Sequence, residues 1–310
     1  MNAIWCESIY LRGYDPRTNQ PLTIDKIKAL ALTLKKHNIK YAYLFAGPYA
    51  TDGHLPSYSF SNHAVESVRI LKKYYPGIVI LPWVGGIENK TVHLDDTAWV
   101  KIALEDTKRL VSRLSVPGVH VDLEFIKKGD HYLDTTMGKE KPLDMINYGN
   151  YVNDFHKKLR ILLPDKFISS VVVATAPDTK PWKRKTSMKE LFELTGYIDQ
   201  LSFLYYDTSI NDEKTYEKNC LDQIKDIQRL KAENNIQYLI SIGTFINVPQ
   251  LHKYRNMSIE NIPNALSCIK KSLNELKSPR NVVSGISIFC NWQTDENEWD
   301  EIDKYSIQLP

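Results

Sequence analysis

Three ionisable side chains alternate with apolar ones in the segment from Gly118 to Phe125. In an extended strand successive side chains point to opposite faces, so His120, Asp122 and Glu124 share one face and apolar residues occupy the other. Burying carboxyl groups is costly unless they are paired or hydrogen-bonded, so such a row calls for a reason. We predict a catalytic row at the carboxyl end of a strand, where a carboxyl group can act as a general acid. A structural ion network and an amphipathic edge strand facing water are the alternatives.

Apolar segments of strand length alternate with amphipathic segments of helix length along the chain. Eight strands are expected, at residues 3–10, 41–47, 78–84, 119–125, 168–174, 201–206, 238–243 and 286–290. Helices are expected between them, the first capped by Thr23 or Asp25, the others at residues 63–75, 97–114, 143–163, 187–194, 215–233, 259–276 and 298–305. No Gly-rich phosphate-binding turn follows the first strand, which disfavours a doubly wound sheet. We therefore predict an α/β fold, a single-domain (β/α)8 TIM barrel over residues 1–310, whose active site lies where the strands end.

The composition narrows the class of partner. The chain has 310 residues, of which 43% are hydrophobic and 11% aromatic, which excludes disorder. Forty Lys and Arg residues against 37 Asp and Glu leave a net charge of +3. This small and evenly spread charge gives no reason to expect a nucleic acid or a membrane as partner.

The strand at 119–125 resembles the fourth-strand signature of glycoside hydrolase family 18, which contains chitinases and endo-β-N-acetylglucosaminidases. That signature reads Asp-Gly-x-Asp-x-Asp-x-Glu. Gly118, Asp122 and Glu124 match it, whereas Pro117 and His120 stand in place of the first and second Asp.

Later strands carry further matches in the order that the family has them. Residues 204–207, Leu-Tyr-Tyr-Asp, resemble the family's Met-x-Tyr-Asp at the end of its sixth strand. Residues 83–86, Trp-Val-Gly-Gly, stand where its third strand often reads Ser-x-Gly-Gly. Residues 285–289 resemble its eighth strand, except that Phe289 replaces the usual Trp and Trp292 follows three residues later. The resemblance covers nearly the whole chain as a pattern of strands, and it is specific at the fourth and sixth strands.

The resemblance implies retaining hydrolysis of glycans assisted by the substrate itself. Glu124 would protonate the leaving oxygen while the 2-acetamido carbonyl of the sugar attacks the anomeric carbon. Asp122 would orient the acetamido N–H, Tyr206 would hold the acetamido oxygen, and Asp207 would contact the sugar. The spacing agrees, because residues two apart on one strand lie about 6.6 Å apart side by side and do not readily flank a glycosidic bond.

His120 is the main departure from the family's pattern. Its imidazole could donate to Asp122 and keep that carboxylate charged, and its own charge would then change near neutral pH. On this hypothesis the pH dependence of activity differs from that of an all-carboxylate relative. The alternative is that His120 is a neutral hydrogen-bonding spacer.

Aromatic side chains near strand ends suit a saccharide cleft. Besides Asp207 and His120, the substrate-binding candidates are Trp83, Tyr205, Phe289 and Trp292, and further candidates are Phe245 and Trp182. For each single aromatic residue, packing in the core or at the rim is the alternative.

The sequence contains no motif for metal binding, for a nucleophilic serine or for phosphate binding. The eight His residues show no H-E-x-x-H or similar spacing, and there is no G-x-S-x-G or P-loop, so we expect neither a metal nor a cofactor. The four Cys residues have no short pair spacing, no signal peptide is visible, and no segment approaches the roughly 20 apolar residues of a membrane span. A cytoplasmic protein is therefore expected, with export by another route or a missing leader left open.

Three hypotheses about the function remain in view. The first is a glycosidase similar to family 18 that acts on β-linked N-acetylglucosamine glycans, which include chitooligosaccharides, peptidoglycan fragments and N-glycan cores. The second is a catalytically weak or inactive carbohydrate-binding barrel, like the family's lectin-type members, although the presence of Glu124 favours the enzyme. An unrelated barrel enzyme is a third. The glycan cut, internal or terminal cleavage and the oligomeric state stay open.

Overall fold

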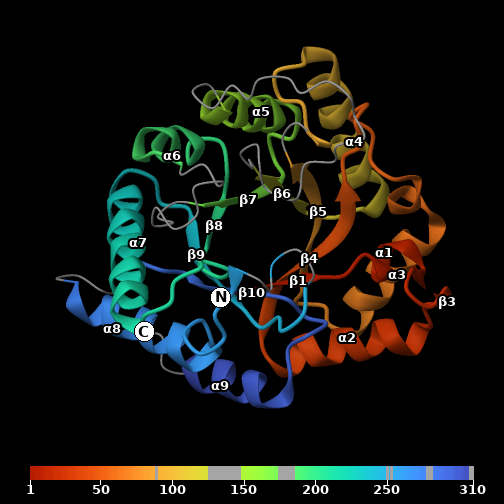
Figure 1. Cartoon of the computed structure of the whole chain (residues 1–310). Coiled ribbons are helices and arrows are strands. Elements are labelled where there is room, and N and C mark those ends of the chain that lie inside the picture. Colours follow the sequence, from red (N-terminus) through yellow and green to blue (C-terminus); the bar gives the residue numbers. More distant parts are fainter. Residues whose placement is uncertain are drawn as a thin grey trace.

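The computed structural model describes residues 1–87, 90–124, 148–173, 186–248, 251, 254–276 and 282–306. Within them, eight parallel strands close into a barrel in the order β1-β10-β9-β8-β7-β6-β5-β4. Helices surround the barrel on its outside (Figure 1). The prediction of a (β/α)8 barrel is therefore confirmed. Phe125 and Trp182 lie outside the described residues.

The elements follow one another as the sequence predicts, with small changes at their ends. The barrel strands are β1 (Asn2–Cys6), β4 (Ile39–Pro48), β5 (Val79–Ile87), β6 (Gly118–Glu124), β7 (Phe167–Val172), β8 (Gln200–Leu204), β9 (Gln237–Gly243) and β10 (Gly285–Phe289). The helices are α1 (Ile9–Arg12), α2 (Ile24–Lys36), α3 (Asn62–Tyr74), α4 (Thr97–Leu114), α5 (Tyr148–Leu162), α6 (Met188–Leu194), α7 (Glu213–Glu233), α8 (Ile262–Glu275) and α9 (Glu296–Ser306). A short hairpin, β2 (Tyr14–Asp15) and β3 (Gln20–Pro21), and a 3-10 helix, η1 (Ser57–Phe60), complete the described elements.

The first strand ends earlier than predicted. It stops at Cys6, and the residues from Ile9 form the short helix α1, in which Tyr10 and Leu11 are buried. Gly13 closes this helix in the left-handed conformation, with φ of 88°. Tyr10 and Leu11 are adjacent yet pack in the same apolar cluster, which the alternation of a strand would not allow. This change places Glu7 and Ser8 in a loop at the carboxyl end of β1.

The helices begin at the residues that the capping rules favour. The Thr23 side chain accepts a hydrogen bond from the backbone N–H of Lys26 and starts α2, as one of the two expected caps. Ser187 and Glu190 form a reciprocal capping box at the start of α6.

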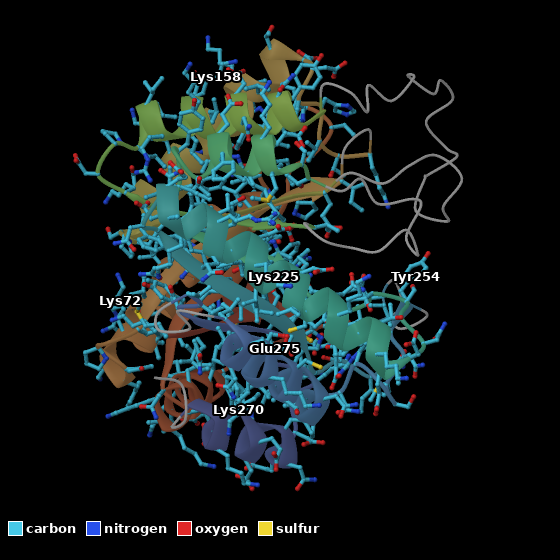
Figure 2. All side chains as sticks on the ribbon, turned by 90° about the vertical axis from the view of Figure 1, so that its left-hand side faces the viewer. Lys72, Lys158, Lys225, Tyr254, Lys270 and Glu275 are labelled. Carbon is cyan, nitrogen blue, oxygen red and sulfur yellow. The ribbon has the colours of Figure 1, made fainter. Side chains whose placement is uncertain are left out.

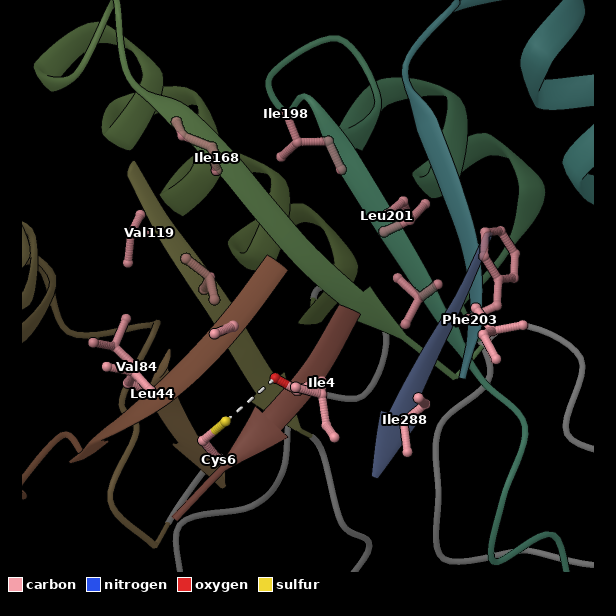
Figure 3. Packing of buried hydrophobic residues seen from close by; sticks show 14 of the residues in the cluster. Ile4, Cys6, Leu44, Val84, Val119, Ile168, Ile198, Leu201, Phe203 and Ile288 are labelled. Carbon is pink, nitrogen blue, oxygen red and sulfur yellow. Dashed lines mark hydrogen bonds between the residues drawn. The ribbon is translucent and has the colours of Figure 1, made fainter. Parts of the chain in front are cut away.

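Two apolar clusters lie on the two sides of the barrel wall. The outer cluster joins the strands to the helices, and Figure 3 shows Val119, Ile168 and Leu201 in it. The inner cluster fills the barrel interior and includes Trp5 and Phe289. Their separation follows from the strand period of two, because every strand sends alternate side chains to opposite faces.

Lysine side chains lie on the solvent-facing sides of three helices. Figure 2 shows Lys158, Lys225 and Lys270 on α5, α7 and α8, where their side chains are exposed to solvent. None of the described helices is long and apolar enough to cross a membrane.

Candidate active site

The ionisable face of β6 points into the barrel, as predicted. Val119, Val121 and Leu123 belong to the outer cluster, which leaves His120 and Asp122 on the interior side. His120 is fully buried in the middle of the barrel, whereas Asp122 and Glu124 are partly exposed where the strand ends. The row thus runs from a closed interior to an open rim.

The rim of β6 rests on β5. Asp122 stands opposite Gly85 in the parallel pairing of the two strands. A Cβ atom at Gly85 would lie 1.8 Å from the backbone oxygen of Asp122, and the φ of Gly85 is +155°. Only glycine therefore allows this approach, which gives the Gly-Gly pair of β5 a structural reason.

Trp83 orients the carboxylate of Asp122. The indole Nε1–H of Trp83, on β5, donates a hydrogen bond of 3.1 Å to Asp122 Oδ2. A carboxylate that accepts a donor inside a partly buried site is held in one rotamer, and its charge is stabilised there. Trp83 thus touches a candidate catalytic group as well as offering an aromatic surface.

Tyr206 lies where the carboxyl groups converge. Its side chain is 7% exposed and stacks on Phe289, with ring centroids 5.1 Å apart and planes at 15°. Burial raises the pKa of Tyr206 well above 10, and the nearby carboxyl groups of Asp207, Asp122 and Glu124 raise this pKa further. The phenol therefore stays protonated and is a hydrogen-bond donor facing the candidate carboxylates.

Asp207 turns the chain away from β8. It is 1% exposed and adopts a left-handed backbone conformation with φ of 52°. The next residue, Thr208, donates its backbone N–H and its hydroxyl to the buried carboxylate of Glu260, at 3.0 and 2.6 Å. Glu260 thereby fixes the turn that carries Tyr206 and Asp207. Glu260 could not be identified from the sequence, because it is distant in the chain and matches no motif.

An aromatic pocket opens beside the rim carboxylates. Its volume is about 290 Å³, and its lining residues are Glu7, Ser8, Ile9, Pro16, Arg17, Phe45, Trp83, Phe289 and Trp292. The ring centroids of Trp83 and Trp292 lie 6.4 and 5.5 Å from that of Phe289. Apolar walls with a few polar groups are typical of pockets for small ligands. The structure thus brings three of the substrate-binding candidates together in one pocket.

The charged residues that line this pocket, Glu7 and Arg17, were not predicted. Glu7 follows directly after β1, and burial raises the pKa of its carboxyl group. Arg17, from the loop between β2 and β3, contacts Glu7 at 2.9 Å and also forks onto both carboxyl oxygens of Asp15. The sequence carries no signal for Glu7, because the first strand is expected to run to residue 10; only the end of β1 at Cys6 places Glu7 at the active-site end of the barrel.

The prediction that Tyr205 binds substrate is wrong. Tyr205 is 1% exposed in the outer cluster, where it stacks on Tyr216 of α7 with centroids 4.5 Å apart. Its hydroxyl donates to the backbone carbonyl of Tyr216. Since adjacent side chains point to opposite faces here, Tyr206 in the interior places Tyr205 among the helices.

The expected hydrogen bond from His120 to Asp122 is also not formed. His120 Nε2 lies 3.1 Å from the indole nitrogen of Trp5, and His120 Nδ1 lies 2.8 Å from the hydroxyl of Ser169. Both ring nitrogens are therefore engaged elsewhere. Burial lowers the pKa of His120 well below 6.5. His120 is thus the neutral spacer of the alternative hypothesis, because nothing here compensates a buried charge.

Across the described ranges, no group of three or more His, Cys, Asp or Glu side chains is arranged to hold a metal ion.

Comparison with known proteins supports the fold. No protein-family model matches the chain, and no curated protein matches its sequence. Among solved structures, the fold is similar to that of a class V chitinase from Pseudomonas fluorescens, with a TM-score of 0.62, 10% identity and 99% of each chain covered. The spore cortex-lytic enzyme SleL of Bacillus cereus aligns with a TM-score of 0.61 and 10% identity, over 98% of this chain and 73% of SleL. A family 18 chitinase from Pseudoalteromonas aurantia aligns with a TM-score of 0.55 and 14% identity over 99% of each chain. The chain thus has the barrel fold of chitinases.

Proposed function

We propose that the protein is a retaining, substrate-assisted glycosidase that cleaves β-linked N-acetylglucosamine-containing glycans. The observation that carries this proposal is that Asp122 accepts the indole N–H of Trp83 and Tyr206 stacks on Phe289, because both of these aromatic rings line the pocket. Glu124 lies close enough to Tyr206 to raise the pKa of its phenol. The sequence resemblance to family 18 and the shared fold with chitinases support the same class.

Each residue has a role that its position allows. Glu124 gives its proton to the glycosidic oxygen as the bond from that oxygen to the anomeric carbon breaks. The acetamido carbonyl oxygen of the sugar forms a new bond to the anomeric carbon and gives a cationic oxazolinium. Asp122, oriented by Trp83, accepts the acetamido N–H and stabilises this positive charge. Tyr206 donates its O–H to the acetamido oxygen and keeps it in line for attack.

The second step restores the enzyme. Water attacks the anomeric carbon, Glu124 now accepts a proton from that water, and the bond to the acetamido oxygen breaks. Two displacements at one carbon give overall retention of configuration. Trp83, Phe289 and Trp292 would present aromatic surfaces to the C–H faces of the sugar in the pocket. Chitooligosaccharides are the simplest substrates with these features.

Hydrolysis of a chromogenic chitooligosaccharide tests the proposal. We expect turnover by the wild type and a loss of about 1,000-fold in kcat for Glu124→Gln, because a positioned general acid contributes about 10²–10⁴-fold. Glu275→Gln is the matched control, since Glu275 is an exposed carboxylate on α8, outside the proposed site (Figure 2). A Glu124→Gln variant as active as the wild type would remove Glu124 from its role. Binding without turnover by the wild type would replace the hydrolase with a carbohydrate-binding barrel.

A further inference from the structure

A chain of hydrogen bonds crosses the barrel below the rim. Trp5 and His120 lie 3.1 Å apart between the indole nitrogen and Nε2, and His120 Nδ1 lies 2.8 Å from Ser169 Oγ. Ser169 Oγ in turn donates to Gln200 Oε1 at 2.8 Å, and Gln200 Nε2 donates to Gln237 Oε1 at 2.9 Å. These bonds, which we name the His120 chain, link β1 to β6, β7, β8 and β9.

The direction of the chain is determined by its first member. An indole N–H can only donate, so Nε2 of His120 must be an acceptor and Nδ1 must carry the proton. Nδ1–H then donates to Ser169, whose own hydroxyl hydrogen is committed to Gln200. The side chains of Trp5, His120 and Ser169 are at most 1% exposed. The imidazole therefore has one tautomer and one charge state that satisfy all its neighbours.

Trp5 connects the His120 chain to the aromatic pocket. Its ring contacts Phe289 edge-on, with centroids 6.0 Å apart. Phe289 lines the pocket and stacks on Tyr206, with centroids 5.1 Å apart. The indole of Trp5 is thus a support beneath the aromatic ring that touches both the pocket and the candidate catalytic phenol.

We propose that His120 is a positioning residue, whose Nε2 holds the indole of Trp5 against Phe289 and so fixes the aromatic pocket and the phenol of Tyr206. Burial keeps His120 neutral, as this acceptor role requires, because a protonated imidazole would present N–H to the N–H of Trp5. His120 acts through Trp5 and does not touch the sugar. The effects on kinetics and on chitotriose binding rest on the proposed function, whereas the hydrogen bond and the exchange of the Trp5 indole N–H do not.

Two substitutions separate the two nitrogens of His120. A Gln side chain places its amide oxygen near the position of Nε2, and an Asn side chain reaches only the position of Nδ1. His120→Gln therefore keeps an acceptor for Trp5, whereas His120→Asn keeps the contact with Ser169 and loses Trp5. Trp5→Phe removes the indole N–H from the other side. Ser170→Ala is the matched control, because Ser170 is a buried hydroxyl on β7 that bonds the carbonyl of Val121.

Kinetics and binding give the first readout. We expect His120→Asn and Trp5→Phe each to lower kcat/KM and the affinity for chitotriose by about tenfold, the value of one buried hydrogen bond. The double variant should lose no more than either single variant, because both remove the same contact. His120→Gln and Ser170→Ala should bind like the wild type. Equal losses in His120→Asn and His120→Gln, or additive losses in the double variant, would overturn the proposal.

Hydrogen exchange of the Trp5 indole N–H gives the second readout, and it needs no activity. The Trp5 signal in a ¹H–¹⁵N spectrum is identified by its disappearance in Trp5→Phe. We expect slow exchange in the wild type and in His120→Gln, and fast exchange in His120→Asn, with thermal unfolding showing that each variant is folded. Equally slow exchange in His120→Asn and the wild type contradicts the role of His120. A wild type that binds chitotriose without cleaving it removes the proposed hydrolase but leaves these tests decisive.

Discussion

The barrel interior has two levels, and each accommodates an ionisable side chain of β6 in a different way. His120 and Asp122 lie two residues apart on one face of β6, about 6.6 Å along the strand. At the middle level His120 is fully buried, neutral and bonded to Trp5 and Ser169. At the rim Asp122 is partly exposed, accepts the indole N–H of Trp83 and lies near a pocket. Two positions along the strand therefore separate a side chain that supports the site from one that faces the substrate.

The physical reason is solvation. A carboxylate at the middle level would have lost its water without gaining a cation, which costs several kcal/mol per ion. A neutral imidazole meets the same neighbours with one donor and one acceptor. At the rim, partial exposure and a directed N–H donor allow a carboxylate to keep its charge. The role of an ionisable group on this strand is therefore decided by its depth in the barrel, and its residue type alone does not predict it.

Among the substitutions that test this difference, we expect the largest effect from Asp122→Asn at the rim. The amide keeps the size of the side chain and an oxygen for the Trp83 N–H, but it removes the charge that stabilises the cationic intermediate. We expect kcat to fall by about 100-fold or more while the free energy of unfolding changes by less than about 1 kcal/mol. Steady-state kinetics and urea denaturation check this. A large loss of stability with intact kcat would show that the rim is structural.

The second test puts a carboxyl group at the middle level. His120→Asp should cost about 3 kcal/mol of unfolding free energy at neutral pH, as an unpaired buried charge does. Burial would raise the pKa of this carboxyl above its unfolded value, so the variant should lose stability as pH rises. The wild type has the opposite dependence, because burial lowers the pKa of His120 below 6.5. Below about pH 6.5 the unfolded chain binds a proton that the folded protein does not, and stability falls as pH decreases.

Urea denaturation at pH 5 and pH 8 measures both slopes. The burial of His156 lowers its pKa to about 4 and adds to the wild-type slope, so the difference between variant and wild type isolates position 120. Ser170→Ala serves as the control and should follow the wild-type slope, because it removes no titratable group. Parallel slopes for His120→Asp and the wild type would show that the middle level is hydrated.

We expect the smallest effects from substitutions of Tyr205 and Tyr206, two adjacent residues that point to opposite faces at the end of one strand. Tyr206→Phe should lower kcat by about tenfold and leave stability unchanged, because it removes a donor to the substrate. Tyr205→Phe should leave kcat unchanged and cost about 1 kcal/mol, because it removes the hydrogen bond to the carbonyl of Tyr216. Loss of kcat in Tyr205→Phe equal to that in Tyr206→Phe would contradict the assignment of the two faces.

Much of the barrel could be predicted because its signals are local. The alternation of Val119, Val121 and Leu123 with ionisable residues is set by the strand period, and the structure places each set on the expected face. The same rule, applied to the end of β8, would have excluded Tyr205 from the pocket. The matched motif at residues 204–207 favoured both tyrosines, but the alternation of the strand sends only Tyr206 into the barrel interior, where it stacks on Phe289.

The residue pattern is sufficient to predict the eight-stranded barrel, the inward row on β6 and the aromatic residues at the strand ends, because these depend on spacing along one strand or helix. The partner that each side chain meets depends instead on how the whole chain folds. The fold joins His120 to Trp5 across 115 positions of the chain, Trp83 to Asp122, and Thr208 to Glu260. Hydrogen bonds between distant segments depend on which strands become neighbours and at what depth each side chain comes to lie. Neither is written in the local pattern of residues, and both decide which ionisable groups are charged.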